Sequence, residues 1–128
     1  MQTYEEWKKA EESDDDLGFR LASLAPKSTG LPMIVWIEVK SFGFDLKPRM
    51  RFTNKTTDSL LPNSWLPISV EKENPRILVS DYQLNISDSD LILLKKWIVR
   101  NCDTLTDYWN GKIDTVECCE KIKKNNNQ

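Results

Sequence analysis

The sequence predicts an α+β fold. We expect a small, mostly antiparallel β-sheet packed by a long C-terminal helix plus a short terminal helix, with a short N-terminal helix before the sheet. Residues 86–124 show helical periodicity with start and stop signals, and residues 31–80 contain several short strand-like segments. The links between those segments suit hairpins. Because the strands must bury their apolar side chains, the helices are expected on one face of the sheet.

At 128 residues, the chain is predicted to form one domain over 1–128. We expect a helical, acidic N-terminal segment over 1–18, an α+β core over 19–124 and a frayed tail over 125–128. Thr3 followed by Glu6 is typical of a helix cap. The acidic run that ends this helix lacks the spacing of a calcium loop, so a solvated turn is favoured over a metal site.

Four segments are predicted to be strands: 31–39, 48–54, 68–70 and 76–80. The first is apolar on both faces, which is typical of a covered strand. The second alternates Arg49 and Arg51 with Met50 and Phe52, the period of a half-exposed strand. The short apolar stretch 19–24 and the Pro-to-Gly loop after it stay outside the predicted sheet.

The long helix is predicted to begin at Ser87, with Asp90 three residues later completing a capping pattern. Apolar residues then recur every three or four positions, which is one stripe of a helix. The stripe consists of Leu91, Leu94, Ile98, Cys102, Leu105 and Trp109. Gly111 suits the left-handed stop, and Asp114 repeats the cap for a second helix. A helix of about 22 residues is about 33 Å long, enough to cross a small sheet.

Charge, hydropathy and cysteine content indicate the cellular compartment of the protein. Charged residues make up 30% of the chain and the formal net charge is −2, so no global field favours nucleic acid or anionic membrane. No apolar run approaches a membrane span, and the acidic N-terminus does not resemble a signal peptide. The three cysteines include an adjacent pair that does not suit a disulfide framework. We therefore expect a cytoplasmic, reduced protein.

Several chemistries are excluded. The chain has no histidine, which removes Ser–His and Cys–His pairs and every His-ligated metal site. Its four glycines are too scattered for a phosphate loop, and no Cys-x-x-Cys pair is present. Cys118 and Cys119 are better explained by one core cysteine and one at the margin than by a redox or soft-metal site. No cofactor, metal or catalytic residue is predicted; an enzyme that uses Asp, Glu, Arg or Tyr alone stays open.

A basic set from neighbouring predicted strands is the first candidate surface: Lys40, Lys47, Arg49, Arg51, Lys55 and Arg76. If Arg49 and Arg51 share an exposed sheet face with Phe42 or Phe44, guanidinium groups and an aromatic ring would bind single-stranded RNA. The favoured alternative is a solvated face with charge pairs that protect the sheet from aggregation.

Five tryptophans form the second feature. Trp36, Trp97 and Trp109 fall within element patterns and are predicted to lie in the core. Trp7 and Trp65 lie in less regular surroundings, so either is a candidate for an exposed partner anchor.

Five stretches carry a resemblance: Thr-Gly-Leu-Pro-Met-Ile-Val-Trp-Ile at 29–37, Pro-Arg-Met-Arg-Phe at 48–52, Asn-Pro-Arg-Ile-Leu-Val at 74–79, Trp-Ile-Val-Arg-Asn at 97–101 and Leu-Thr-Asp-Tyr-Trp-Asn-Gly at 105–111. Over roughly 20–124 the chain resembles a family of small uncharacterised bacterial proteins. It is similar, more loosely, to a group with suspected toxin–antitoxin-like gene pairs. Such relatives often carry His or a basic residue before the Arg-rich strand, where this chain reads Leu-Lys-Pro-Arg. The resemblance implies the same fold and a bacterial cytoplasmic setting, without an active site.

We therefore expect a small binding or interaction protein without autonomous catalysis. The second hypothesis is a toxin–antitoxin-type component that binds RNA or a partner protein, and the third is a His-free enzyme. The expected partner is another protein or a second copy, with RNA as the alternative and no membrane. The candidate binding residues are Arg49, Arg51, Lys47, Arg76, Phe44 and Trp65.

Overall fold

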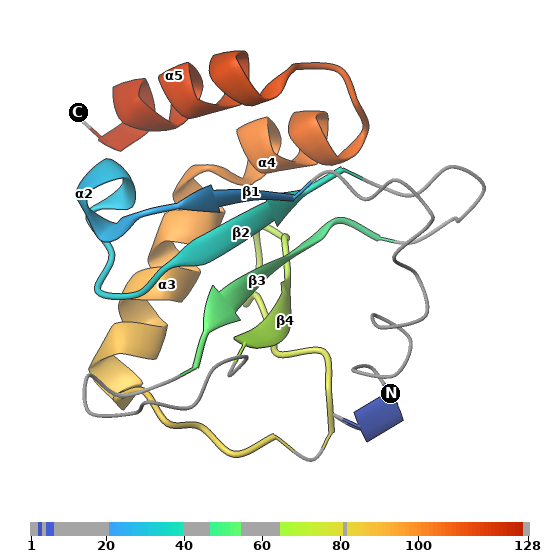
Figure 1. The fold of residues 1–128 in the computed structure, drawn as a ribbon, viewed down its shortest axis with the longest axis vertical. Coiled ribbons are helices and arrows are strands. Elements are labelled where there is room, and N and C mark those ends of the chain that lie inside the picture. Colours follow the sequence, from blue (N-terminus) through green and yellow to red (C-terminus); the bar gives the residue numbers. More distant parts are fainter. Residues whose placement is uncertain are drawn as a thin grey trace.

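The computed structural model describes residues 3, 5–6, 21–39, 47–54, 65–80 and 82–126. Its described part contains one four-stranded antiparallel sheet in the order β1-β2-β3-β4, followed by C-terminal helices (Figure 1). The strands are β1 (Leu21–Leu24), β2 (Val35–Glu38), β3 (Arg49–Thr53) and β4 (Trp65–Ser69). The helices are α2 (Pro26–Thr29), α3 (Asp88–Arg100), α4 (Cys102–Trp109) and α5 (Thr115–Asn126). The predicted α+β class and antiparallel sheet are confirmed.

The register of the sheet separates an apolar face from a mixed one. Val35 pairs with Phe52 and Ile37 pairs with Met50, and all four side chains are buried. Their face packs against the helices, which supply further buried residues to the same core: Leu94, Trp97, Ile98, Leu105, Cys118 and Ile122. In Figure 1, α3 crosses behind the sheet and α5 runs along the β1 edge. The core therefore lies between one sheet face and the helices, as predicted.

The edges of the sheet differ from the expectation. Strand β1 is not predicted because its four residues, Leu-Ala-Ser-Leu, are too few to show alternation; it pairs with β2 from Leu21 to Leu24. The predicted strand at 76–80 instead contains isolated bridge residues at Ile77 and Val79, and Ile77 pairs with Ile68. Ser69 N–H donates to the Arg76 carbonyl at 2.9 Å, so this segment still pairs with part of the β4 edge.

Residues 26–30, expected to be a loop, contain the one-turn helix α2. Pro26 occupies the first turn, where its missing N–H costs no helical hydrogen bond. Gly30 has a φ of 79° and its N–H donates to the Pro26 carbonyl, which ends the helix. Pro and Gly are equally typical of turns and of helix ends, so the sequence alone does not distinguish the two here.

The predicted helix boundaries are confirmed at three positions. Asp90 N–H donates to Ser87 Oγ at 3.1 Å, and Glu117 N–H donates to Asp114 Oδ1 at 2.8 Å. Gly111 lies after α4 with a φ of 74°. The Ser87 and Asp114 side chains accept hydrogen bonds from backbone N–H groups that a helix start leaves unpaired. Gly111 adopts the left-handed conformation that is common just after a helix.

The predicted long helix is divided at Asn101 into α3 and α4. Asn101 is fully buried, with φ −104° and ψ 13°. Its Nδ2 donates to the Trp97 carbonyl at 2.9 Å, and its Oδ1 accepts from Asn125 Nδ2 at 3.0 Å. Asn side chains compete with the backbone for hydrogen bonds, which favours such breaks. The apolar stripe continues across the break, so its spacing does not reveal it.

At the N-terminus, Glu6 N–H donates to Thr3 Oγ1 at 3.2 Å, as the predicted cap requires. The rest of the predicted N-terminal helix, the acidic run and Trp7 lie outside the described residues. Of the predicted tail, Asn125 and Asn126 belong to α5. No helix among the described residues is both long enough and apolar enough to cross a bilayer.

Candidate functional site

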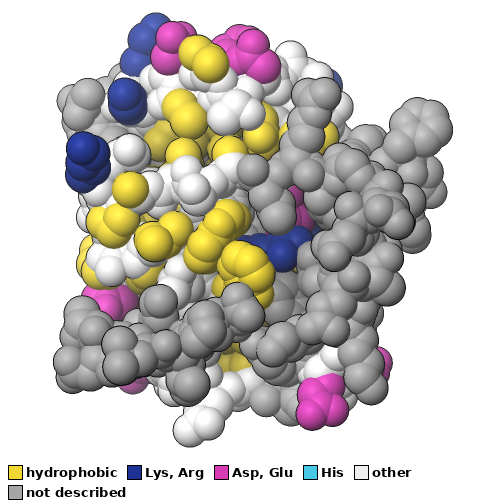
Figure 2. Space-filling view, in the orientation of Figure 1, with side chains coloured by type: hydrophobic (Ala, Val, Ile, Leu, Met, Phe, Trp, Pro, Cys, Tyr) yellow, Lys and Arg dark blue, Asp and Glu magenta, His cyan; other side chains and the backbone are white. Residues whose placement is uncertain are grey.

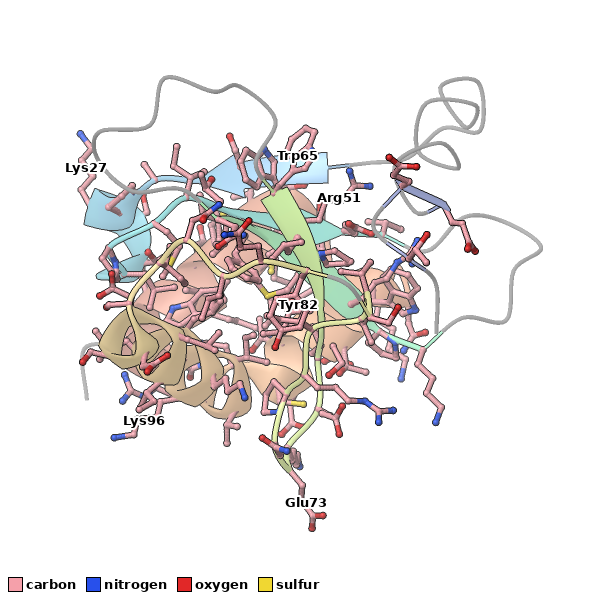
Figure 3. All side chains as sticks on the ribbon, turned by 90° about the horizontal axis from the view of Figure 1, so that it is seen from below. Lys27, Arg51, Trp65, Glu73, Tyr82 and Lys96 are labelled. Carbon is pink, nitrogen blue, oxygen red and sulfur yellow. The ribbon has the colours of Figure 1, made fainter. Side chains whose placement is uncertain are left out.

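The face of the sheet opposite the helices carries the predicted arginines. Arg51 lies opposite Trp36 on β2 and opposite Pro67 on β4, while Trp65 lies opposite Thr53. Figure 3 shows Arg51 and Trp65 on the side of the sheet away from α3 and Lys96. Arg49 and Arg51 therefore share one face, as the alternation predicts, and that face also carries two tryptophans.

Glu38 of β2 holds both arginines. Arg51 Nε donates to Glu38 Oε1, and Arg49 Nε lies 3.7 Å from Glu38 Oε2. The side chains of Arg51 and Glu38 are 3% and 1% exposed, against 18% for Arg49. The Arg51 guanidinium also lies 5.6 Å from the Trp65 ring centroid. A buried charge is tolerated only when it is paired, and Glu38 supplies the opposite charge for the buried Arg51. The Trp65 ring adds a cation–π contact to the same guanidinium.

The two tryptophans of this face contact each other. The Trp36 and Trp65 ring centroids are 4.8 Å apart, with an interplanar angle of 82°. Both rings are half-buried. Figure 2 shows basic atoms beside hydrophobic side chains near the middle of this face. Trp65 is thus engaged by Trp36 and Arg51 within the molecule, which reduces the ring surface it offers a partner.

The exposed arginine pair expected for RNA binding is not what the structure shows, because Arg51 is buried and joined to Glu38. The favoured alternative is right about the charge pairs and wrong about solvation, because Arg51 and Glu38 are buried. Glu38 was not among the predicted site residues. The sequence does contain a signal for Glu38. It lies two residues after Trp36, so both side chains share one face of β2, and β2 pairs with the strand that carries the arginines.

The remaining predicted residues are dispersed. Lys47 is exposed just before β3. Arg76 is exposed on the segment that pairs with β4, so β3 and β4 lie between it and Glu38 of β2. Phe44 lies outside the described residues, as do Lys40, Phe42 and Lys55. Within the described part, the structure therefore brings together only Arg49, Arg51 and Trp65 of the predicted site.

A second surface, which the sequence reasoning missed, lies on the outer side of α3. Ile92, Leu93 and Val99 are 52%, 49% and 40% exposed, which makes three of the six exposed large hydrophobic residues in the described part. Beside them is an open hollow of about 380 Å³. It is lined by Asn74, Pro75, Lys95, Lys96, Val99 and Arg100. We call these residues, together with Ile92 and Leu93, the α3 surface.

The α3 surface is basic as well as apolar. Lys95, Lys96 and Arg100 form no ion pair with any residue that the structure describes; the pairs Lys72–Asp103 and Lys121–Glu117 lie elsewhere. Figure 3 shows Lys96 on α3, with Glu73 pointing outward from a separate turn. A signal for this surface was present in the sequence. Ile92, Lys96 and Val99 recur at spacings of four and three on the side opposite the buried stripe.

The cysteines lie as the favoured interpretation predicts. Cys118 is buried and Cys119 is half-buried. Burial raises the pKa of the Cys118 thiol to about 12, and it also raises the pKa of Cys102. Among the described residues, no group of three or more His, Cys, Asp or Glu side chains is placed to hold a metal ion.

No protein-family model, curated protein or solved structure matches this chain. The resemblance to small bacterial proteins stays a prediction.

Proposed function

We propose that this is a binding protein without catalysis of its own, and that its α3 surface docks an acidic segment of a partner protein. One observation carries the proposal: Ile92, Leu93 and Val99 are all exposed within two turns of one helix, next to three cations. Grouped exposed apolar residues with a polar border are typical of interaction sites.

The chemistry of the surface selects the partner. Burying a fully exposed Val, Leu or Ile side chain contributes about 1.5–3 kcal/mol. Ile92, Leu93 and Val99 are 52%, 49% and 40% exposed, so a partner would gain about half of that from each of the three. Lys95, Lys96 and Arg100 would pair with carboxylates at the border, which sets orientation and speeds association more than it adds affinity. An acidic segment with two or three apolar side chains meets both requirements.

The other partners expected from the sequence fit this surface less well. Single-stranded RNA needs aromatic platforms for its bases, but Trp97, the aromatic residue of α3, is buried. Two copies that met through their α3 surfaces would bring like charges together. The toxin–antitoxin hypothesis remains compatible in its protein-binding form, and no observation favours a His-free enzyme.

Site-specific photocrosslinking in the producing cell tests the proposal. Benzoylphenylalanine at position 92 samples the α3 surface, and the same group at Val116 is the control, because Val116 is 67% exposed on α5. We expect a protein adduct from position 92 that position 116 does not give. The double variant Lys96→Glu, Arg100→Glu should abolish that adduct, and its crosslinked peptide should be acidic.

Three results would contradict the proposal. An adduct removed by ribonuclease would identify RNA, and an adduct with twice the mass of the chain would identify a second copy. Equal adducts from positions 92 and 116, or adducts that persist after charge reversal, would show that the α3 surface has no selective partner.

A further inference from the structure

A separate cavity of about 280 Å³ lies between α5, β1 and α2. It is lined by Ser23, Leu24, Ser28, Cys119, Ile122 and Lys123. Figure 1 shows α2 beside the C-terminal half of α5, and both helices contribute lining residues to the cavity. The α3 surface lies on another helix, so ligand binding in this cavity is independent of the proposed function.

The cavity has an apolar floor and a polar rim. Leu24 and Ile122 are 7% and 2% exposed and belong to the core. Ser23, Ser28 and Lys123 are exposed, and Cys119 is half-buried between floor and rim. Lys123 forms no ion pair within the part of the chain that the structure describes. The lining includes one cation and no carboxylate, so its local charge favours an anion.

We propose that this cavity binds a small aliphatic monocarboxylate. The carboxylate would accept a charge-assisted hydrogen bond from the Lys123 ammonium group and a hydrogen bond from the Ser28 hydroxyl. Ser23 pairs with Trp36, so its side chain lies on the sheet face away from the helices and is not assigned as a donor. The aliphatic chain would lie on Leu24 and Ile122. Ligand pockets commonly span about 300–1,000 Å³, so a cavity of about 280 Å³ admits only a short chain.

Cys119 provides a reporter inside the cavity. Cys102 and Cys118 are buried, and burial raises the pKa of both thiols, so N-ethylmaleimide should modify Cys119 first. We expect butyrate to slow that modification in a saturable way, with matching amide shifts in Ser23, Ser28 and Lys123 by NMR. Butan-1-ol, which has the same chain without the charge, should give neither effect.

Two lysine variants separate binding at the site from a general charge effect. Lys123→Met should raise the butyrate Kd about tenfold, as expected for the loss of a charge-assisted hydrogen bond. Lys124→Met removes the same charge from an exposed neighbour outside the lining and should leave the Kd unchanged. Failure of butyrate to protect Cys119, equal protection by butan-1-ol, or equal effects of the two variants would each overturn the proposal.

Discussion

Glu38 is the residue that changes the interpretation of the basic strand. Alternation correctly places Arg49 and Arg51 on one face, but it treats charged residues as outward and solvated. In the structure, the Glu38 carboxylate between them makes burial of Arg51 possible. A period-two pattern identifies which side chains share a face. It does not identify which of those side chains pair across strands, because that depends on register.

Glu38→Gln should therefore be strongly destabilising. The substitution keeps the shape of the side chain but leaves the buried Arg51 charge without its carboxylate, and breaking a buried pair typically costs about 3–5 kcal/mol. The measurement is the free energy of unfolding from urea titration. Asp103→Asn is the matched control, since the Lys72–Asp103 pair is exposed and such pairs contribute about 0–1 kcal/mol. Equal effects of the two variants would contradict a buried ionic cluster.

Cys118 should make stability fall at alkaline pH. Burial raises the pKa of its thiol from 9.0 to about 12, so above pH 9 the unfolded chain loses this proton before the folded chain does. The unfolded state then binds fewer protons, and the free energy of unfolding decreases as pH rises from about 9 to about 12. Under reducing conditions, Cys118→Val should show a shallower decline than the wild type. Parallel curves would rule out this contribution.

At the scale of elements, the sequence predicts helix ends better than it predicts interruptions. Ser87, Asp114 and Gly111 act locally, within one turn, and all three are confirmed. At the break, Asn101 bonds both the nearby Trp97 carbonyl and Asn125, which lies 24 residues away. The four residues of β1 likewise form a strand through pairing with β2. Elements decided by distant partners leave no local signal.

Asn101→Ala should destabilise α5 as well as the junction between α3 and α4. The variant removes the acceptor of the half-buried Asn125 Nδ2 and one of two donors to the Trp97 carbonyl, which keeps its bond from the Asn101 backbone N–H. Each lost hydrogen bond contributes about 0.5–1.5 kcal/mol. Amide hydrogen exchange should show faster exchange in the last turn of α5. Asn110→Ala, at an exposed position after α4, is the control. Unchanged exchange in α5 would show that the Asn101–Asn125 bond does not hold that helix.

At the scale of the whole molecule, the fold is more predictable than the site. Periodicity is repeated over many residues, so single errors do not alter the predicted layers. A binding surface depends on a few residues from segments far apart in the chain. The hollow beside α3 is lined by Asn74 and Pro75 together with Lys95, Lys96, Val99 and Arg100, and only the folded chain brings these two segments together.

The charge of the whole molecule predicts that it does not bind RNA. With a net charge of −2 and Arg51 buried against Glu38, the chain should show no saturable binding of single-stranded RNA at about 50 mM salt. Any binding would fall with salt at a logarithmic slope of about −0.7 per phosphate contact. Arg49→Ala is the clean probe of the sheet face, because Arg51→Ala should also destabilise the fold. A slope reduced by Arg49→Ala, but not by Lys96→Ala, would restore the sheet face as the RNA site. The reverse would move RNA binding to the α3 surface and contradict its assignment to a protein partner.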